Sequence, residues 1–228
     1  MATTNAVLGF WLATGAASAT VLGWVIIAGR KQVSDQVIGA ALILAALAML
    51  YVSFTQLIPE ALATNFSNFE LALWLGIGAG IVVVLRLIGD KFSKLDSIKS
   101  SAILVAGAIA AHNLPEGAAA VATTVQDLTA GITTSIAIAV HNIPEGLAIA
   151  AAALSAGFTK FKALIFVAIA AGAEILGSAI VLVEVQLLND GVISQLLTVV
   201  AGIMITLSVI ELLPHGYAKF RTKGERTH

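Results

Sequence analysis

The sequence predicts an all-α membrane protein, a polytopic bundle of helices that cross the lipid bilayer. Hydrophobic residues make up 59% of the 228 residues and charged residues 11%, whereas soluble domains average about 45–50% apolar and about 25% charged residues. The apolar residues also come in blocks of about 20, which is the length of helix that crosses ~30 Å of hydrocarbon. We therefore expect residues 1–228 to form a single transmembrane domain.

Seven apolar runs, each bounded by polar or turn-forming residues, predict seven transmembrane helices. Glycine, asparagine, aspartate and serine fill the short connections between the runs, and these residue types suit turns and helix caps. Residues 215–228 follow the last run and are expected to form a basic tail. The predicted helices lie near residues 5–29, 37–62, 71–90, 101–124, 129–156, 161–188 and 192–214.

The charged residues predict how these helices are oriented. When the seven runs are threaded alternately, all 12 lysines and arginines fall on one side, and the opposite loops carry carboxylates such as Glu60, Glu70, Asp127 and Asp190. Cytoplasmic loops are enriched in basic residues, so we expect the N-terminus outside and residue 228 in the cytoplasm. The expected location is the inner, or cytoplasmic, membrane.

A six-residue motif occurs twice. His112-Asn113-Leu114-Pro115-Glu116-Gly117 in the fourth predicted helix recurs 29 residues later, at residues 141–146 in the fifth, with isoleucine in place of the leucine. Histidine and glutamate four residues apart lie about 40° apart around a helix and ~6 Å apart along it, so both reach one point. Since the chain has no cysteine, imidazole and carboxylate are the main ligands on offer, and they suit zinc, iron, manganese, cobalt or nickel. The two motifs predict a metal site whose ligands come from His112, Glu116, His141 and Glu145.

Three more polar residues extend this candidate site. Asn113 and Asn142 lie about 100° around the helix from their histidines, in position to offer an amide oxygen to an adjacent ion. Glu174 is a carboxylate deep in the sixth predicted helix, where burial costs roughly 3 kcal/mol and calls for a role. Interhelical hydrogen bonding alone is the alternative for these side chains. Gly117 and Gly146 are expected to let the fourth and fifth helices approach each other closely.

A second, fainter repeat links the second and seventh predicted helices. Met, Ser, Gln/Glu and Pro recur at identical spacing, and each helix is expected to stop at its proline. The two helices run in opposite directions, which is typical of inverted-repeat transporters with a site near the midplane. The repeat also calls for an eighth helix, related to the third. Candidate pathway residues are Met49, Ser53, Gln56, Met204, Ser208 and Glu211; ordinary packing for the methionines and contact with water for Glu211 are the alternatives.

These motifs resemble the ZIP family, the zinc- and iron-regulated transporter-like proteins, and especially its bacterial GufA-like branch. AEILG around Glu174, QLIPEA in the second helix and ELLP in the seventh add to the likeness. The resemblance implies eight helices in a 3+2+3 inverted repeat, with a binuclear site between helices four, five and six. It assigns His112, Glu116 and Glu145 to a first ion, with His141 and Met49 nearby. Asn113, Asn142 and Glu174 would hold a second ion, bridged to the first by Glu116 and Glu145.

We therefore expect a transporter of divalent transition metals into the cytoplasm, with zinc first and iron, manganese, cobalt or cadmium also carried. No enzyme activity, prosthetic group or nucleic acid partner is expected; the expected partners are the metal ions, the bilayer and a second copy of the chain in a homodimer. An intramembrane metalloenzyme is one alternative, although the sequence lacks H-E-x-x-H, and its single Glu-x-x-His, Glu225 to His228, lies in the predicted tail rather than in a helix. A protein that conducts protons through its buried carboxylates is the other.

Overall fold

Long helices make up nearly all of the computed structural model, which describes residues 2–29, 33–63, 66–93, 97–187 and 189–221. The seven predicted runs overlap, in order, the long helical regions of the described residues, so the all-α prediction is confirmed. The long helices are α1 (Ala2–Ala28), α2 (Asp35–Val52), α4 (Asn68–Ser93), α5 (Ser97–Gln126), α6 (Leu128–Ser155), α7 (Lys160–Val183) and α8 (Asp190–Leu207). A short 3₁₀ helix, η2 (Val185–Leu187), follows α7.

Four of these helices begin at a polar side chain that caps the first turn. In each case the side-chain oxygen accepts a hydrogen bond from a backbone N–H three residues later, which would otherwise lack a partner. The capping residues are Ser34 for α2, Asp127 for α6, Thr159 for α7 and Asn189 for α8.

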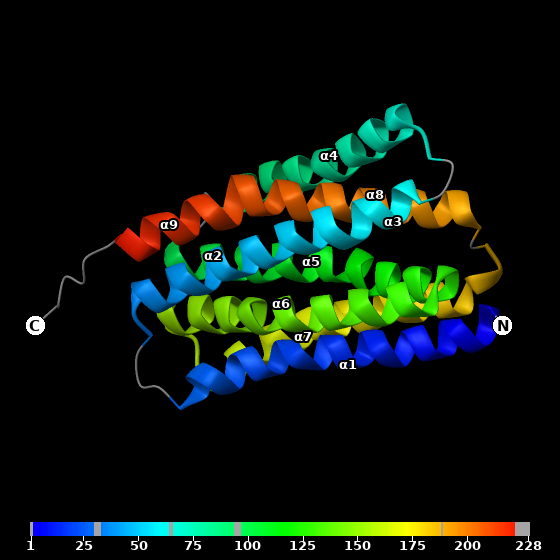
Figure 1. Ribbon diagram of the computed structural model, residues 1–228. Coiled ribbons are helices and arrows are strands. Elements are labelled where there is room, and N and C mark those ends of the chain that lie inside the picture. Colours follow the sequence, from blue (N-terminus) through cyan, green and yellow to red (C-terminus); the bar gives the residue numbers. More distant parts are fainter. Residues whose placement is uncertain (1, 30–32, 64–65, 94–96, 188, 222–228) are drawn as a thin grey trace, which may run out of the picture.

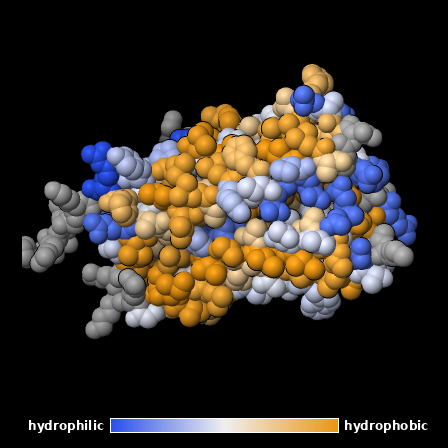
Figure 2. Space-filling view, in the orientation of Figure 1, coloured by the Kyte–Doolittle hydropathy of each residue, from blue (hydrophilic) through white to orange (hydrophobic). Residues whose placement is uncertain are grey.

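Consecutive long helices run antiparallel, so the first and the last described residues lie at opposite ends of the bundle (Figure 1). Among the described residues, six helices are long and apolar enough to cross a membrane; α5, which carries the first motif, is the seventh long helix. Large apolar side chains such as Trp11, Leu44 and Val183 are more than half exposed. Apolar residues cover much of the face in Figure 2, and hydrophilic residues lie at its two ends and in a band that runs from the centre toward the right end. The chain is a multi-pass membrane protein.

The helices pack in two groups that meet at the motif-bearing pair. α1, α5, α6 and α7 all contact one another, while α4 packs along α8 and α2 packs against α6 and the last helix of the chain. α5 also contacts α8. Because α5 and α6 lie inside this arrangement, the motifs they carry are shielded from the surroundings by the other helices.

A π-helical turn interrupts both helices of the second repeat. α2 passes through η1 (Ser53–Leu57) into α3 (Ile58–Leu62), and α8 passes through η3 (Ser208–Leu212) into α9 (Leu213–Arg221). The N–H of Ile58 bonds to the carbonyl of Ser53, five residues earlier, and Leu213 bonds to Ser208 in the same way. The two π turns occupy equivalent places in the repeat, and such turns are frequent at functional sites.

The predicted stop at Pro214 was wrong, because the last helix continues past it, whereas the second helical region ends at Leu62, the last residue of the predicted range 37–62. Proline lacks the N–H that would bond to the carbonyl four residues earlier. For Pro214 that carbonyl belongs to Ile210, and the Arg86 guanidinium donates to it at 3.0 Å. The last helix therefore extends to Arg221, so residues 215–221 of the predicted tail are helical; residues 222–228 lie outside the described part of the chain. Lys219 on α9 pairs with Asp35 at the start of α2, at 2.7 Å.

Candidate metal centre

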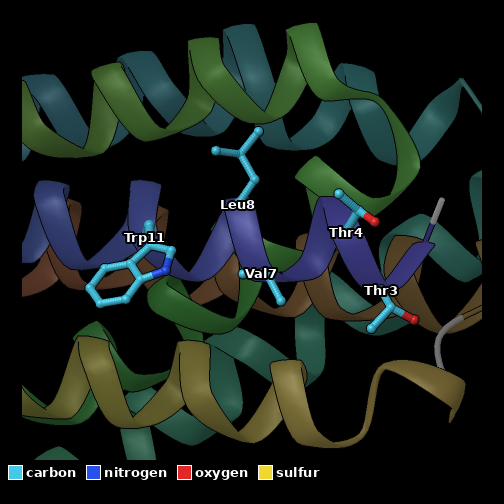
Figure 3. A pocket seen from close by; sticks show the side chains of 5 residues that line it. All are labelled: Thr3, Thr4, Val7, Leu8 and Trp11. Atoms are coloured by element: carbon cyan, nitrogen blue, oxygen red, sulfur yellow. The ribbon is translucent and has the colours of Figure 1, made fainter.

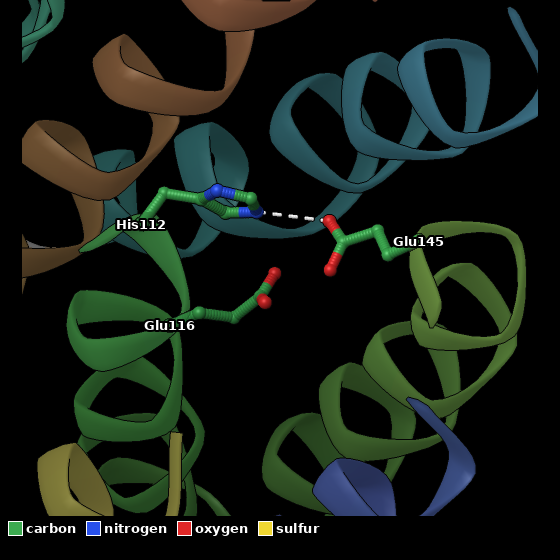
Figure 4. Close-up of side chains that lie close together, drawn as sticks. All are labelled: His112, Glu116 and Glu145. Carbon is green, nitrogen blue, oxygen red and sulfur yellow. Dashed lines mark hydrogen bonds and ion pairs between the residues drawn. The ribbon is translucent and has the colours of Figure 1, made fainter. Parts of the chain in front are cut away.

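The histidine of each motif contacts the glutamate of the other. His112 Nε2 on α5 lies 2.8 Å from Glu145 Oε1 on α6, and His141 Nε2 on α6 lies 2.7 Å from Glu116 Oε1 on α5. Figure 4 shows His112 and Glu145 pointing toward each other, with Glu116 between the two helices. All four residues are at most 3% exposed. The two motifs thus bring four side chains, His112, Glu116, His141 and Glu145, into one cluster, which we call the ring, rather than two separate His–Glu pairs.

Three members of the ring are close enough to share one ion. Ligand atoms of His112, Glu116 and Glu145 all lie within 4.8 Å of one another. His141 Nε2 is also 4.0 Å from Glu145 Oε1. An imidazole and two carboxylates, with a second imidazole beside them, make a nitrogen and oxygen donor set of the kind that zinc and related first-row metals accept.

Several polar atoms of the ring have no hydrogen bond to other described residues. They are both carboxylate oxygens of Glu116, Oε2 of Glu145 and Nε2 of His141. The contact between His141 and Glu116 is short but lacks hydrogen-bond geometry. Leaving such groups buried without partners costs about 1–3 kcal/mol each, and more when they are charged. A divalent cation held between them would offset this cost.

The asparagines and Glu174 form a second cluster beside the ring. Asn142 Nδ2 donates to Glu174 Oε2 at 2.8 Å and to the Ala16 carbonyl at 2.9 Å, and Asn113 Nδ2 donates to the Ala170 carbonyl at 3.4 Å. These bonds fix the amide orientation and leave Oδ1 of both asparagines and Oε1 of Glu174 without a partner among the described residues. The free atoms are all oxygens, which favours a cation as their ligand.

The motif glycines do not bring α5 and α6 together, so that prediction was wrong. A Cβ added to Gly117 would overlap the carbonyl of Glu174 on α7, and one added to Gly146 would overlap the carbonyl of Thr20 on α1. Gly177 of α7 meets the Leu114 carbonyl, and Gly23 of α1 meets α6, in the same way. Each motif helix therefore packs closely against its own outer partner, α5 against α7 and α6 against α1.

These contacts reveal a third repeat that our sequence analysis missed. Residues 16–23 of α1 read AASATVLG, and residues 170–177 of α7 read AAGAEILG. The first segment packs against α6 through the Thr20 carbonyl and Gly23. The second packs against α5 through the Glu174 carbonyl and Gly177. The repeat was visible in the sequence, because five of its eight positions are identical, but short small-residue segments are common in membrane helices.

Two of the predicted pathway residues meet where α2 and α8 cross. Ser208 Oγ donates to Met49 Sδ at 3.6 Å, and Met49, Met204, Ser53 and Ser208 are fully buried. The other two, Gln56 and Glu211, belong to the same π turns as Ser53 and Ser208, and each turn contacts the opposite helix, η1 with α8 and η3 with α2. Gln56 lies in η1 and Glu211 in η3, and the helices that continue from these π turns, α3 and α9, point to opposite ends of the bundle (Figure 1).

Glu211 interacts with basic and imidazole side chains rather than with water alone. Its carboxylate lies 3.5 Å from the Arg86 guanidinium and 3.5 Å from His215 Nδ1, and its side chain is 27% exposed. Arg86 thus contacts both the carbonyl freed by Pro214 and the carboxylate next to it. Three elements, α4, η3 and α9, are joined at this point.

Two hollows have linings among the described residues. A cavity of about 250 Å³ between α4, α5 and α8 is lined by His112 and otherwise by apolar residues such as Leu85, Pro115 and Ile203. A hollow of about 500 Å³ on α1 is lined by Thr3, Thr4, Val7, Leu8 and Trp11 (Figure 3). The described lining of the α1 hollow offers neither carboxylate nor imidazole.

Comparison with known proteins agrees with the geometry of the site, because both indicate binding of metal ions. The family model described as ZIP zinc transporter matches residues 89–225, which include both motifs, Glu174 and the whole of α8. A zinc transporter ZupT of Escherichia fergusonii is 35% identical over 217 residues, covering 87% of this chain and 82% of the relative. ZupT proteins of Salmonella heidelberg and Salmonella newport are 36% identical with the same coverage. The chain therefore belongs to the ZIP zinc transporter family.

Proposed function

We propose that this protein transports divalent transition metal ions across the membrane, with zinc as the main substrate. The observation that carries the proposal is the buried ring in which His112 contacts Glu145 and His141 contacts Glu116. Such side chains are costly inside a membrane and are retained where they serve a pathway. Membership of the ZIP family supports the proposal, and so do relatives that are named zinc transporters.

We assign two ion positions to the site. The first ion binds His112, Glu116 and Glu145, with His141 beside them. The second binds the free oxygens of Asn113, Asn142 and Glu174, and Glu116 and Glu145 bridge the two. When an ion enters, each glutamate exchanges its histidine partner for the metal, so the protein's own ion pairs hold the ligands in place until the substrate arrives. The ion would also offer a partner to the carboxylate oxygens that have none among the described residues in the metal-free site.

We further propose that transport runs toward the cytoplasm and that the basic end of the bundle faces it. Lys160, Lys162, Lys219 and Arg221 belong to that end, and the positive-inside rule supports this orientation. The carboxylates at the other end, such as Glu60 and Asp127, would attract cations from outside. The inner membrane location and a homodimer remain predictions.

Zinc uptake into proteoliposomes tests the proposal against both alternatives. The purified protein is reconstituted with a zinc-sensitive dye inside the vesicles, and protein-free vesicles serve as the control. We expect zinc to accumulate down its gradient, with iron, manganese, cobalt and cadmium competing and calcium not. A metal-independent proton current with no zinc flux would instead favour the proton-conducting alternative. The absence of zinc flux together with metal-dependent turnover of an added substrate would favour an enzyme.

A further inference from the structure

Thr20 on α1 occupies the place that Glu174 occupies on α7. The carbonyl of Thr20 receives Gly146 of α6, and the carbonyl of Glu174 receives Gly117 of α5. One turn earlier, Ala16 accepts from Asn142, just as Ala170 accepts from Asn113. Both residues are the fifth of the eight-residue segments AASATVLG and AAGAEILG. The two halves of the fold therefore present a hydroxyl and a carboxylate at equivalent positions.

The Thr20 hydroxyl is buried and has no hydrogen bond to another described residue. Its side chain is 0% exposed, and Oγ1 finds no partner. Helical threonines usually donate to the carbonyl four residues earlier, as Thr14 does to Phe10 at 2.8 Å and Thr124 does to Ala120 at 2.7 Å. For Thr20 that carbonyl belongs to Ala16, which already accepts from Asn142. The hydroxyl is left with a free donor and free acceptor sites.

We propose that Thr20 is a neutral member of the second ion position and that it sets the charge of that position. This inference rests on the proposed function. In α7 the equivalent side chain, Glu174, is held by Asn142, and the equivalent neighbour of Thr20 is Asn113 on α5, a helix that α1 contacts. The site then holds three carboxylates, from Glu116, Glu145 and Glu174, and one hydroxyl, instead of four carboxylates.

A neutral oxygen at this position would favour release of the ion. Affinity for a divalent cation rises with the number of charged ligands and with the rigidity of the site, and conduction requires binding that is weak enough to reverse. Thr20 still offers an acceptor oxygen that helps to replace the water lost by the ion. The difference between Thr20 and Glu174 thus lowers the affinity for the second ion. The equivalent backbone contacts of α1 and α7 keep the two side chains in equivalent positions.

Removal of the hydroxyl is the first test. Thr20→Val keeps the shape of the side chain, Thr20→Ser restores the hydroxyl, and Thr14→Val on the same helix is the matched control. We measure zinc binding to the detergent-solubilised protein at equilibrium and the half-saturating zinc concentration for uptake. We expect Thr20→Val to weaken binding of the second ion about fivefold, the effect of losing one ligand contact of ordinary strength. Thr20→Ser is expected to match the wild type within about twofold, and Thr14→Val to leave binding unchanged. Wild-type binding and uptake by Thr20→Val would overturn the inference.

A transfer of the carboxylate between the two halves is the second test, and it does not depend on the stability of Thr20→Val. Glu174→Thr should lose the second ion, and Glu174→Thr combined with Thr20→Glu should recover it, because the carboxylate returns at the equivalent position. Failure of the double variant to bind more zinc than Glu174→Thr would overturn the inference. If the wild-type protein binds and carries no zinc, the proposed function itself fails. If the wild-type protein carries zinc and the Thr20 variants bind and carry zinc just as it does, the inference fails and the proposed function stands.

Discussion

His112 Nε2 lies 2.8 Å from Glu145 Oε1, so a histidine of the first motif is held by the glutamate of the second across the α5–α6 interface. His141 and Glu116 repeat this contact in the opposite sense at 2.7 Å. The two copies of the motif are therefore parts of one unit, and each contacts the other through its histidine and its glutamate.

This crosswise arrangement predicts which pairs of substitutions are coupled. His112→Ala and Glu145→Ala remove partners of one contact, so their effects on stability in metal-free detergent should be strongly non-additive, by about 0.5–3 kcal/mol. His112→Ala and Glu116→Ala lie on one helix and break different contacts, so their coupling should be smaller. Thermal unfolding of the single and double variants measures both cycles. Equal coupling in the two cycles would argue that the ring does not exist in the metal-free protein.

The close helix crossings predict a sharp difference between neighbouring glycines. Gly177→Ala should strongly destabilise the protein, because its Cβ would overlap the Leu114 carbonyl of α5. Gly172→Ala on the same helix has open space around the new methyl group and should be neutral or slightly stabilising, since alanine favours helix by up to ~1 kcal/mol over glycine. Melting temperatures in detergent compare the two. Similar melting temperatures for both variants would contradict the crossing of α5 and α7 described above.

Arg86 is predicted to hold the π turn of the seventh helical region. Arg86→Ala would leave the Ile210 carbonyl without its 3.0 Å donor and Glu211 without its cation at 3.5 Å. We expect a loss of stability on the order of 1 kcal/mol, because the guanidinium is half exposed and such contacts are screened. Arg86→Lys should recover part of the loss, since it keeps the charge but not the planar donor geometry. An unfolding curve for Arg86→Ala that overlays the wild type would show that Pro214 does not depend on this contact.

The helices, and the grouping of polar residues in the candidate site, could be predicted from the sequence because their causes are local. Hydropathy over about 20 residues fixes a membrane helix, and an i, i+4 spacing places His112 with Glu116 on one face. The crosswise pairing of His112 with Glu145 could not be predicted, because spacing along one helix does not say which side chain of another helix faces it. The same limit explains the error about Gly117, whose partner lies on α7.

The π turns escaped prediction for a different reason. Each depends on how the chain accommodates Pro59 or Pro214, and a helix can stop, kink or widen at proline. The carbonyl freed by Pro214 is satisfied by Arg86, more than 120 residues away in the chain, which is a tertiary effect. The repeat of residues 16–23 and 170–177 was within reach of the sequence, and it would have indicated Thr20 as the counterpart of Glu174.

Zinc flux through a Glu145→Ala variant tests the central claim most directly. Glu145 is 1% exposed, contacts His112 and lies 4.0 Å from His141, so its loss should disable both ion positions. The variant is compared in proteoliposomes with the wild type and with Glu184→Ala, an exposed carboxylate after α7, after matched folding is verified by melting temperature. The account predicts zinc accumulation for the wild type and for Glu184→Ala and none above protein-free vesicles for Glu145→Ala. Wild-type flux through Glu145→Ala would contradict it.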